Sequence, residues 1–175
     1  MHTPILTDSH FHIITTGGTI DTTHIDDTDD TLYTFQESSI PKKIHQWKMA
    51  PSVTYTHLTP INSLFMKDDY RETILQAIHV YTHTKVLITH GTDTMVETAK
   101  YLEWKVEGKR VVLVWAMIPS RENHTDAYVN LSFALWILET SIEWGVFIAM
   151  NGQVFSPQNV KKNRDTIPPR FERIS

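Results

Sequence analysis

The sequence predicts a three-layer α/β domain, in which a mainly parallel sheet carries helices on both faces. Short β-branched and apolar runs alternate along the chain with segments of helical periodicity, and this alternation is typical of parallel sheets. Most of these runs are continuously apolar, as expected for strands covered on both faces. With 175 residues, of which 41% are hydrophobic, the chain is long enough for one such domain with a substantial core.

Five segments are predicted as strands. The first, residues 10–16, is rich in β-branched and aromatic residues and ends in a tight turn at Gly17-Gly18. The others are residues 52–58, 85–90, 110–116 and 146–150. We expect these four to be buried on both sides, because they are mostly continuous apolar or β-branched runs.

Three apolar stripes at helical spacing lie between the strands. They are Tyr70, Ile74, Ile78 and Tyr81; Met95, Ala99, Leu102 and Val106; and Tyr128, Leu131, Leu135, Leu138 and Ile142. Right-handed crossovers through these helices give a Rossmann/flavodoxin-like topology, with ligands bound at the carboxyl ends of the strands. We expect a single domain over residues 1–175, in which the Thr- and Asp-rich segment 17–36 forms a mobile active-site loop.

Composition excludes several classes of protein. The 16 basic and 20 acidic residues give a net charge of −4, which does not favour nucleic-acid binding. The absence of cysteine excludes disulfides, thiolate metal sites and a thiol nucleophile. The longest apolar run, residues 111–118, is too short to span a membrane. The first residues lack the pattern of a secretory signal, so we expect a soluble, cytoplasmic protein.

Two threonine- and glycine-rich turns follow predicted strands. Thr15-Thr16-Gly17-Gly18-Thr19 places hydroxyls beside two glycines that allow a ligand to approach the backbone, although a plain strand-ending turn explains this string equally well. The motif is not GxGxxG, which disfavours a dinucleotide site.

The second turn, His90-Gly91-Thr92-Asp93-Thr94-Met95, precedes a helix. Thr94 and Glu97 have the spacing of a capping box. The capping box does not involve Thr92 and Asp93. We expect these two residues to face the ligand cleft at the carboxyl ends of the strands, near helix N–H groups that favour an anionic ligand or a developing oxyanion.

A basic cluster, Lys161-Lys162-Asn163-Arg164, lies near the C-terminus. Such a cluster is usually a solvated surface. A lysine that is desolvated beside a Thr/Asp pair can, however, lose its proton near neutral pH and act as a base.

Histidine and aspartate patterns that resemble metal sites are interpreted as non-functional. Asp8-x-His10-x-His12 lacks further ligands at a metal-binding spacing, and His79 and His83 lie beside an apolar helical stripe. The run of residues 26–30 lacks the glycine and the closing glutamate of a calcium loop. We therefore expect no metal site at these residues.

Taken together, these motifs resemble the N-terminal domain of the bacterial-type L-asparaginase family. The resemblance covers nearly the whole chain, in the order of the family. It rests on TTGGTI (15–20), ITHGTDTM (88–95), AMIPS (116–120), Asp126, Asn130 and AMNGQVF…NVKKN (149–163). It implies hydrolysis of the side-chain carboxamide of L-asparagine to L-aspartate and ammonia, through a threonine acyl-enzyme and without a cofactor.

The resemblance also implies roles for individual residues. Thr16 matches the nucleophile and Tyr33 the tyrosine of the mobile loop that assists it. Thr92 and Lys162 match the second nucleophile/base unit. Asp93 matches the aspartate that also holds the substrate amino group. Ser63 matches the serine that binds the α-carboxylate. Backbone N–H groups of Gly17 or Thr92 are candidates for the oxyanion site, and Gly91 is expected to line the substrate site.

Some positions depart from the family. Gln36 replaces a frequent glycine, Leu64-Phe65 replace Gln-Asp, and Ile118 replaces an arginine. The C-terminal domain of long members has no counterpart within the 175 residues, so weak substrate affinity is expected. The family is generally oligomeric, which implies a homo-dimer or tetramer, and the five tryptophans are either core residues or an exposed patch for self-association.

Three alternative functions are left open. One is a non-catalytic domain that binds a small amino acid, and another is a hydrolase of a different carboxamide. The third is a metal-dependent hydrolase that uses His10 and His12.

Overall fold

The computed structural model describes residues 10–25, 33–50, 52–166 and 170–174. A six-stranded sheet forms the centre, in the order β4-β1-β5-β6-β7-β8. All neighbours are parallel except β8, which pairs antiparallel with β7. The strands are β1 (His10–Gly17), β4 (Ser52–Ile61), β5 (Lys85–Thr89), β6 (Arg110–Val114), β7 (Gly145–Met150) and β8 (Gln153–Phe155).

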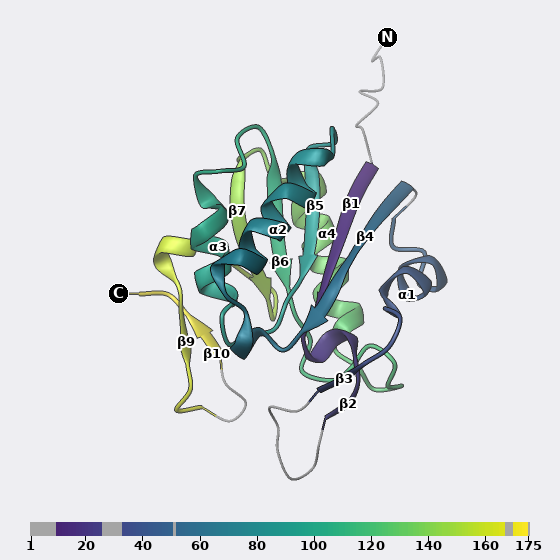
Figure 1. The fold of residues 1–175 in the computed structure, drawn as a ribbon. Coiled ribbons are helices and arrows are strands. Elements are labelled where there is room, and N and C mark those ends of the chain that lie inside the picture. Colours follow the sequence, from purple (N-terminus) through teal and green to yellow (C-terminus); the bar gives the residue numbers. More distant parts are fainter. Residues whose placement is uncertain (1–9, 26–32, 51, 167–169, 175) are drawn as a thin grey trace.

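Helices cover both faces of this sheet (Figure 1). They are α1 (Ile40–Gln46), α2 (Asp68–Val80), α3 (Met95–Glu103) and α4 (Ala127–Thr140). Side chains alternate along a strand, so Ile88 packs in the core under α2 and α3, while its neighbour Leu87 packs with α1 and α4. The predicted three-layer α/β architecture is confirmed.

Strand β4 differs from its prediction. Its residues are half-buried or exposed along the whole strand, from Ser52 to Ile61. The reason is its position at the edge of the sheet, where only β1 pairs with it. The prediction of a strand covered on both faces is therefore wrong for residues 52–58, and correct for the central strand β5, which is buried throughout.

One helical stripe and one pair of histidines also differ from their predictions. In α4, Tyr128 is exposed and Ile142 lies beyond the end of the helix. The buried face consists of Ala127, Asn130, Leu131, Ala134, Leu135 and Leu138. His83, expected together with His79 beside the helical stripe that begins at Tyr70, follows the end of α2 and stacks on His10.

Several short elements had no clear periodic signal. Besides α1 and β8, they include two antiparallel hairpins and three 3-10 helices. These are β2 (Thr22–Ile25) with β3 (Tyr33–Phe35), β9 (Lys161–Asn163) with β10 (Arg170–Glu172), η1 (Thr19–Asp21), η2 (Ser63–Phe65) and η3 (Pro157–Asn159). The expected polar loop 17–36 thus contains η1 and the β2–β3 hairpin; its mobility stays a prediction.

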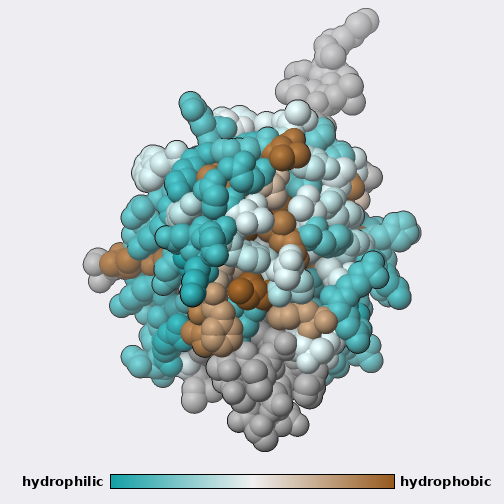
Figure 2. Space-filling model, in the orientation of Figure 1, coloured by the Kyte–Doolittle hydropathy of each residue, from teal (hydrophilic) through white to brown (hydrophobic). Residues whose placement is uncertain are grey.

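The surface is largely hydrophilic on the face shown in Figure 2, with separate apolar patches. Of the five tryptophans, Trp115 is buried, which confirms a core position for this residue, whereas Trp104, Trp136 and Trp144 are exposed; their role in self-association stays a prediction. Among the described residues, no helix has the length and apolar character needed to cross a membrane.

Burial predicts a large difference in stability between two isoleucine substitutions. Ile78 is 0% exposed in the core, and Ile142 is 93% exposed. Ile78→Ala should lower the free energy of unfolding by about 2–5 kcal/mol, because it leaves a cavity. Ile142→Ala should change it by less than about 0.5 kcal/mol. Urea denaturation of both variants measures the difference, and equal losses would contradict the described core.

Candidate active site

The parallel strands β1 and β5 are neighbours in the sheet, so their carboxyl ends lie next to each other. Thr15 is paired with Thr89 in the parallel register, so the turns that follow the two strands lie side by side. A Cβ on Gly18 would lie 2.6 Å from the backbone nitrogen of Gly91, and Gly18 has a φ of +75°. Only glycine fits there, because the two turns are in direct backbone contact.

The 3-10 helix η2 packs against the second turn through Ser63. The Ser63 hydroxyl accepts a hydrogen bond from the Asp93 N–H at 3.2 Å, and the Thr94 hydroxyl donates to the Ser63 carbonyl at 2.7 Å. A Cβ on Gly91 would lie 2.4 Å from Ser63 Oγ. Thr94 is the N-cap of α3, but its side chain makes no capping hydrogen bond, so the predicted capping box is wrong: the hydroxyl instead ties α3 to η2.

Lys162 on β9 reaches the turn after β5. Its Nζ donates to Thr92 Oγ1 and to Asp93 Oδ1, both at 2.8 Å. The side chain of Lys162 is only 13% exposed and that of Asp93 is 25% exposed. A largely buried lysine beside a Thr/Asp pair is thus present, and its partners lie 70 and 69 residues away in the sequence.

Arg164, one residue beyond β9, is a second cation on the same carboxylate. Its guanidinium donates to Asp93 Oδ1 at 3.1 Å. Burial acts to raise the pKa of Asp93, but the hydrogen bonds and positive charges of Lys162 and Arg164 outweigh it, so the pKa lies below its usual range. Asp93 is therefore held as a carboxylate. From the sequence, Arg164 is predicted only as part of a basic cluster, because nothing local indicates its contact with Asp93.

Thr16 is fully buried at the end of β1. Its hydroxyl donates to the backbone carbonyl of Thr89 at 2.7 Å. The residue expected to be a nucleophile thus directs its proton toward β5 in this conformation. Tyr33 begins β3, but its side chain lies outside the described part of the chain.

His90 forms the floor beneath the second turn. Its Nδ1 donates to the Gly91 carbonyl at 2.7 Å, and its Nε2 accepts from the Thr98 hydroxyl at 2.8 Å. Burial lowers the pKa of His90 to about 4, so the ring is neutral at physiological pH. From the sequence, His90 is predicted only to end a strand and begin the second turn; a polar residue at the end of an apolar run is the available signal for its buried role.

The histidines considered for metal binding make other contacts. His12 is buried, hydrogen-bonds to Thr54 and stacks on Tyr81, while His10 contacts Ser52 and stacks on His83. Among the described residues, no group of three potential ligands could hold a metal. Asp8 and residues 26–30 lie outside that part of the chain.

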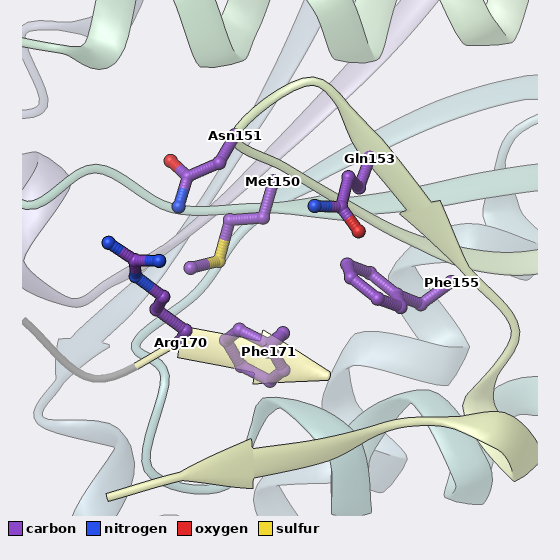
Figure 3. Close-up of a pocket in the computed structure, with 6 residues that line it drawn as sticks. All are labelled: Met150, Asn151, Gln153, Phe155, Arg170 and Phe171. Atoms are coloured by element: carbon purple, nitrogen blue, oxygen red, sulfur yellow. The ribbon is translucent and has the colours of Figure 1, made fainter. Parts of the chain in front are cut away.

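A cavity of about 330 Å³ opens beside the β9–β10 hairpin (Figure 3). Its lining residues are Met150, Asn151, Gln153, Phe155, Arg170 and Phe171. Phe171 pairs with Lys162 across the hairpin, and it lies 6.4 Å from the ring of Phe155. The aromatic wall of this cavity thus supports the strand from which Lys162 projects.

Residues 10–175 match the family model described as "Asparaginase, N-terminal". The chain belongs to the asparaginase family. Among curated relatives, it is 31% identical to a probable periplasmic L-asparaginase of Haemophilus influenzae over 91% of this chain and 48% of that protein. It is also 31% identical to L-asparaginase 2 of Escherichia coli, over 93% of this chain and 49% of that protein.

Solved structures of asparaginases share the fold. A probable cytoplasmic L-asparaginase of Campylobacter jejuni is 31% identical with a TM-score of 0.72, over 88% of this chain and 49% of that one. L-asparaginase I of Vibrio cholerae has a TM-score of 0.80 at 23% identity, over 94% of this chain and 51% of that one. The chain therefore spans about half the length of the curated relatives it matches.

The backbone contact between the two turns predicts the behaviour of glycine substitutions in this asparaginase domain. Gly18→Ala should destabilise the fold by at least about 2 kcal/mol more than Gly108→Ala, because the added methyl group would overpack the backbone of Gly91. Gly108 is a matched control, since its φ of +70° is similar but its Cβ would meet nothing within 4 Å. If urea denaturation shows that both variants lose the same free energy of unfolding, the contact between the two turns is wrong.

The neutral, buried His90 predicts a loss of stability on acidification. The unfolded chain protonates this ring near pH 6.5, whereas the folded protein does so only near pH 4. Protons therefore favour unfolding as the pH falls through this window. The loss from this ring should be on the order of 3 kcal/mol, at about 1.4 kcal/mol per pKa unit.

Unfolding measured at several pH values checks this prediction. His90→Asn should flatten the decrease between pH 6.5 and pH 4, whatever its effect on stability at pH 8. His45→Asn is the control, because His45 is exposed on α1 and should leave the slope unchanged. If the free energy of unfolding depends on pH equally steeply in His90→Asn and in the wild type, another group causes the loss and the prediction is wrong.

Proposed function

We propose that this domain hydrolyses the side-chain carboxamide of L-asparagine to L-aspartate and ammonia through a threonine acyl-enzyme. The observation that carries the proposal is the largely buried contact of Lys162 Nζ with Thr92 Oγ1 and Asp93 Oδ1, each at 2.8 Å. A weakly nucleophilic threonine hydroxyl needs an adjacent base, and these three groups supply a hydroxyl, an amine and an orienting carboxylate.

The covalent steps are those of acyl transfer. The Thr16 oxygen attacks the carboxamide carbon, the C–N bond breaks, and ammonia leaves with the proton that the hydroxyl gives up. Water then attacks the ester and releases L-aspartate, while its second proton restores the hydroxyl. We assign these proton transfers to Thr92 and Lys162, with Tyr33 as the assisting residue of the segment 17–36.

Binding of the substrate is assigned to the residues around the second turn. Ser63 and Asp93 share a hydrogen bond at 3.2 Å, which supports neighbouring subsites for the α-carboxylate and the α-ammonium group. Gly17 and Gly91 lie where a side chain would collide with its surroundings, and we propose that their backbones line the substrate site. The N–H groups of Gly17 or Thr92 would stabilise the oxyanion.

Catalysis by Thr16 requires a change from the described conformation. Its hydroxyl must leave the Thr89 carbonyl, to which it donates at 2.7 Å, before its oxygen can reach a substrate. We propose that substrate binding, together with closure of the segment 17–36 as a lid, causes this rotation and excludes water until the substrate is in place.

The same buried hydroxyl favours a second candidate function. A non-catalytic domain that binds a small amino acid would retain the Ser63–Asp93 contact without needing a mobile Thr16. In that case, L-asparagine would raise the melting temperature of the protein without any release of ammonia.

We further propose self-association and a cytoplasmic location. The exposed rings of Trp104, Trp136 and Trp144 support a homo-oligomer, a dimer or tetramer, because large aromatic residues often anchor interfaces. The name of the Campylobacter relative supports the cytoplasm, whereas that of the Haemophilus relative indicates the periplasm. Light scattering and cell fractionation test these two proposals.

Ammonia release from L-asparagine at high substrate concentration is the decisive test. Thr16→Ala and Thr92→Ala should each lower kcat by at least about a hundredfold, because each removes a group that acts on the reacting bonds. Thr140→Ala is the control, since this exposed threonine bonds only within α4 to the Trp136 carbonyl among the contacts described. Turnover that survives in Thr16→Ala would overturn the assigned nucleophile.

A further inference from the structure

We infer that Arg164 is a specificity-determining residue that selects against an ammonium group beside Asp93. The inference concerns the site of the proposed function and rests on it. Arg164 donates to Asp93 Oδ1 at 3.1 Å, and Lys162 donates to the same oxygen at 2.8 Å. The contact should therefore lower the preference of the site for L-asparagine relative to a carboxamide that carries a carboxylate but no adjacent amino group.

The charges at this carboxylate are unbalanced. Before Lys162 gives up a proton to act as a base, one negative charge on Asp93 faces two positive charges, on Lys162 and Arg164, so one positive charge is in excess among these three groups. An ammonium group that enters here competes with Arg164 for the carboxylate and is repelled by both cations. An anionic group is attracted instead, as next to any local excess of positive charge.

The two cations differ in how firmly they are held. The Lys162 side chain is 13% exposed, and it also bonds to Thr92. The Arg164 side chain is 61% exposed. Arg164 can therefore be replaced without opening the core, and its exposed ion pair is of the kind that contributes little to stability. Its effect should appear in ligand preference rather than in folding.

The neighbouring residue Lys161 provides a matched control. It has the same charge as Arg164 and is exposed on β9, but none of the described contacts joins it to Asp93. Lys161→Gln therefore removes one positive charge from the same hairpin. Any effect of net charge on the attraction of anions will appear in both variants, whereas competition at Asp93 will appear only in Arg164→Gln.

The test compares L-asparagine with succinamate, which has the same carboxamide and carboxylate but no amino group. We expect Arg164→Gln to raise the ratio of kcat/KM for L-asparagine over succinamate by up to about fivefold, the upper limit for an exposed charge pair. Lys161→Gln should shift this ratio less than Arg164→Gln does, because it removes only the general attraction of the anionic succinamate. An unchanged ratio in Arg164→Gln, or an equal shift in both variants, would overturn the inference.

A binding measurement separates this inference from the proposed function. Calorimetry with L-aspartate and succinate gives the same comparison without turnover, and the ratio of their Kd values should shift by the same factor in Arg164→Gln. If this ratio shifts but the wild-type protein releases no ammonia, the proposed hydrolysis is wrong and the role of Arg164 stands. If ammonia is released but neither ratio shifts, hydrolysis stands and the role of Arg164 is wrong.

Discussion

Parallel pairing of β1 with β5 places two turns so close together that their backbones touch at Gly18 and Gly91. The arrangement of the candidate site depends on this contact. It fixes the position of Thr16 near the end of β1 relative to Thr92 and Asp93, which lie in the turn before α3. It also leaves no room for a side chain on either glycine, because Gly91 faces Ser63 on its other side.

Polar groups beneath the site are satisfied by one another. His90 bonds to the Gly91 carbonyl and to Thr98, and Arg71 donates to the same threonine hydroxyl at 3.1 Å. Thr16 bonds to the Thr89 carbonyl. Buried polar groups without partners would lower the stability of the fold, so this network of hydrogen bonds stabilises the buried side of the site. The charged groups of the C-terminal hairpin form the other side.

The charged part of the site comes from a different region of the chain. Lys162 lies on a short strand whose partner β10 buries Phe171 against Phe155, so an aromatic contact next to the cavity positions the amine. Arg164 follows the same strand at the solvent-exposed rim. The hairpin thus sets both the buried pair with Thr92 and the excess of positive charge at Asp93.

Much of this molecule could be predicted from residue order. The five long strands and three main helices appeared as apolar runs and stripes, because burial in a layered α/β fold leaves a local periodic pattern. Motif resemblance indicated Thr16, Thr92, Asp93 and Lys162. Strands such as β9, with three residues, are too short to leave such a pattern, and the edge position of β4 depends on which strands pair with it.

The sequence by itself determined the class of fold, the family and the types of side chain available for chemistry, because these follow from local pattern and motif. Only the tertiary structure decided that the Thr94 hydroxyl bonds to Ser63 instead of capping its helix, that Thr16 points to Thr89, and that Arg164 shares a carboxylate oxygen with Lys162. Each of these contacts joins residues about 30 to 70 positions apart. Their partners are chosen by strand order and packing, which no local pattern specifies.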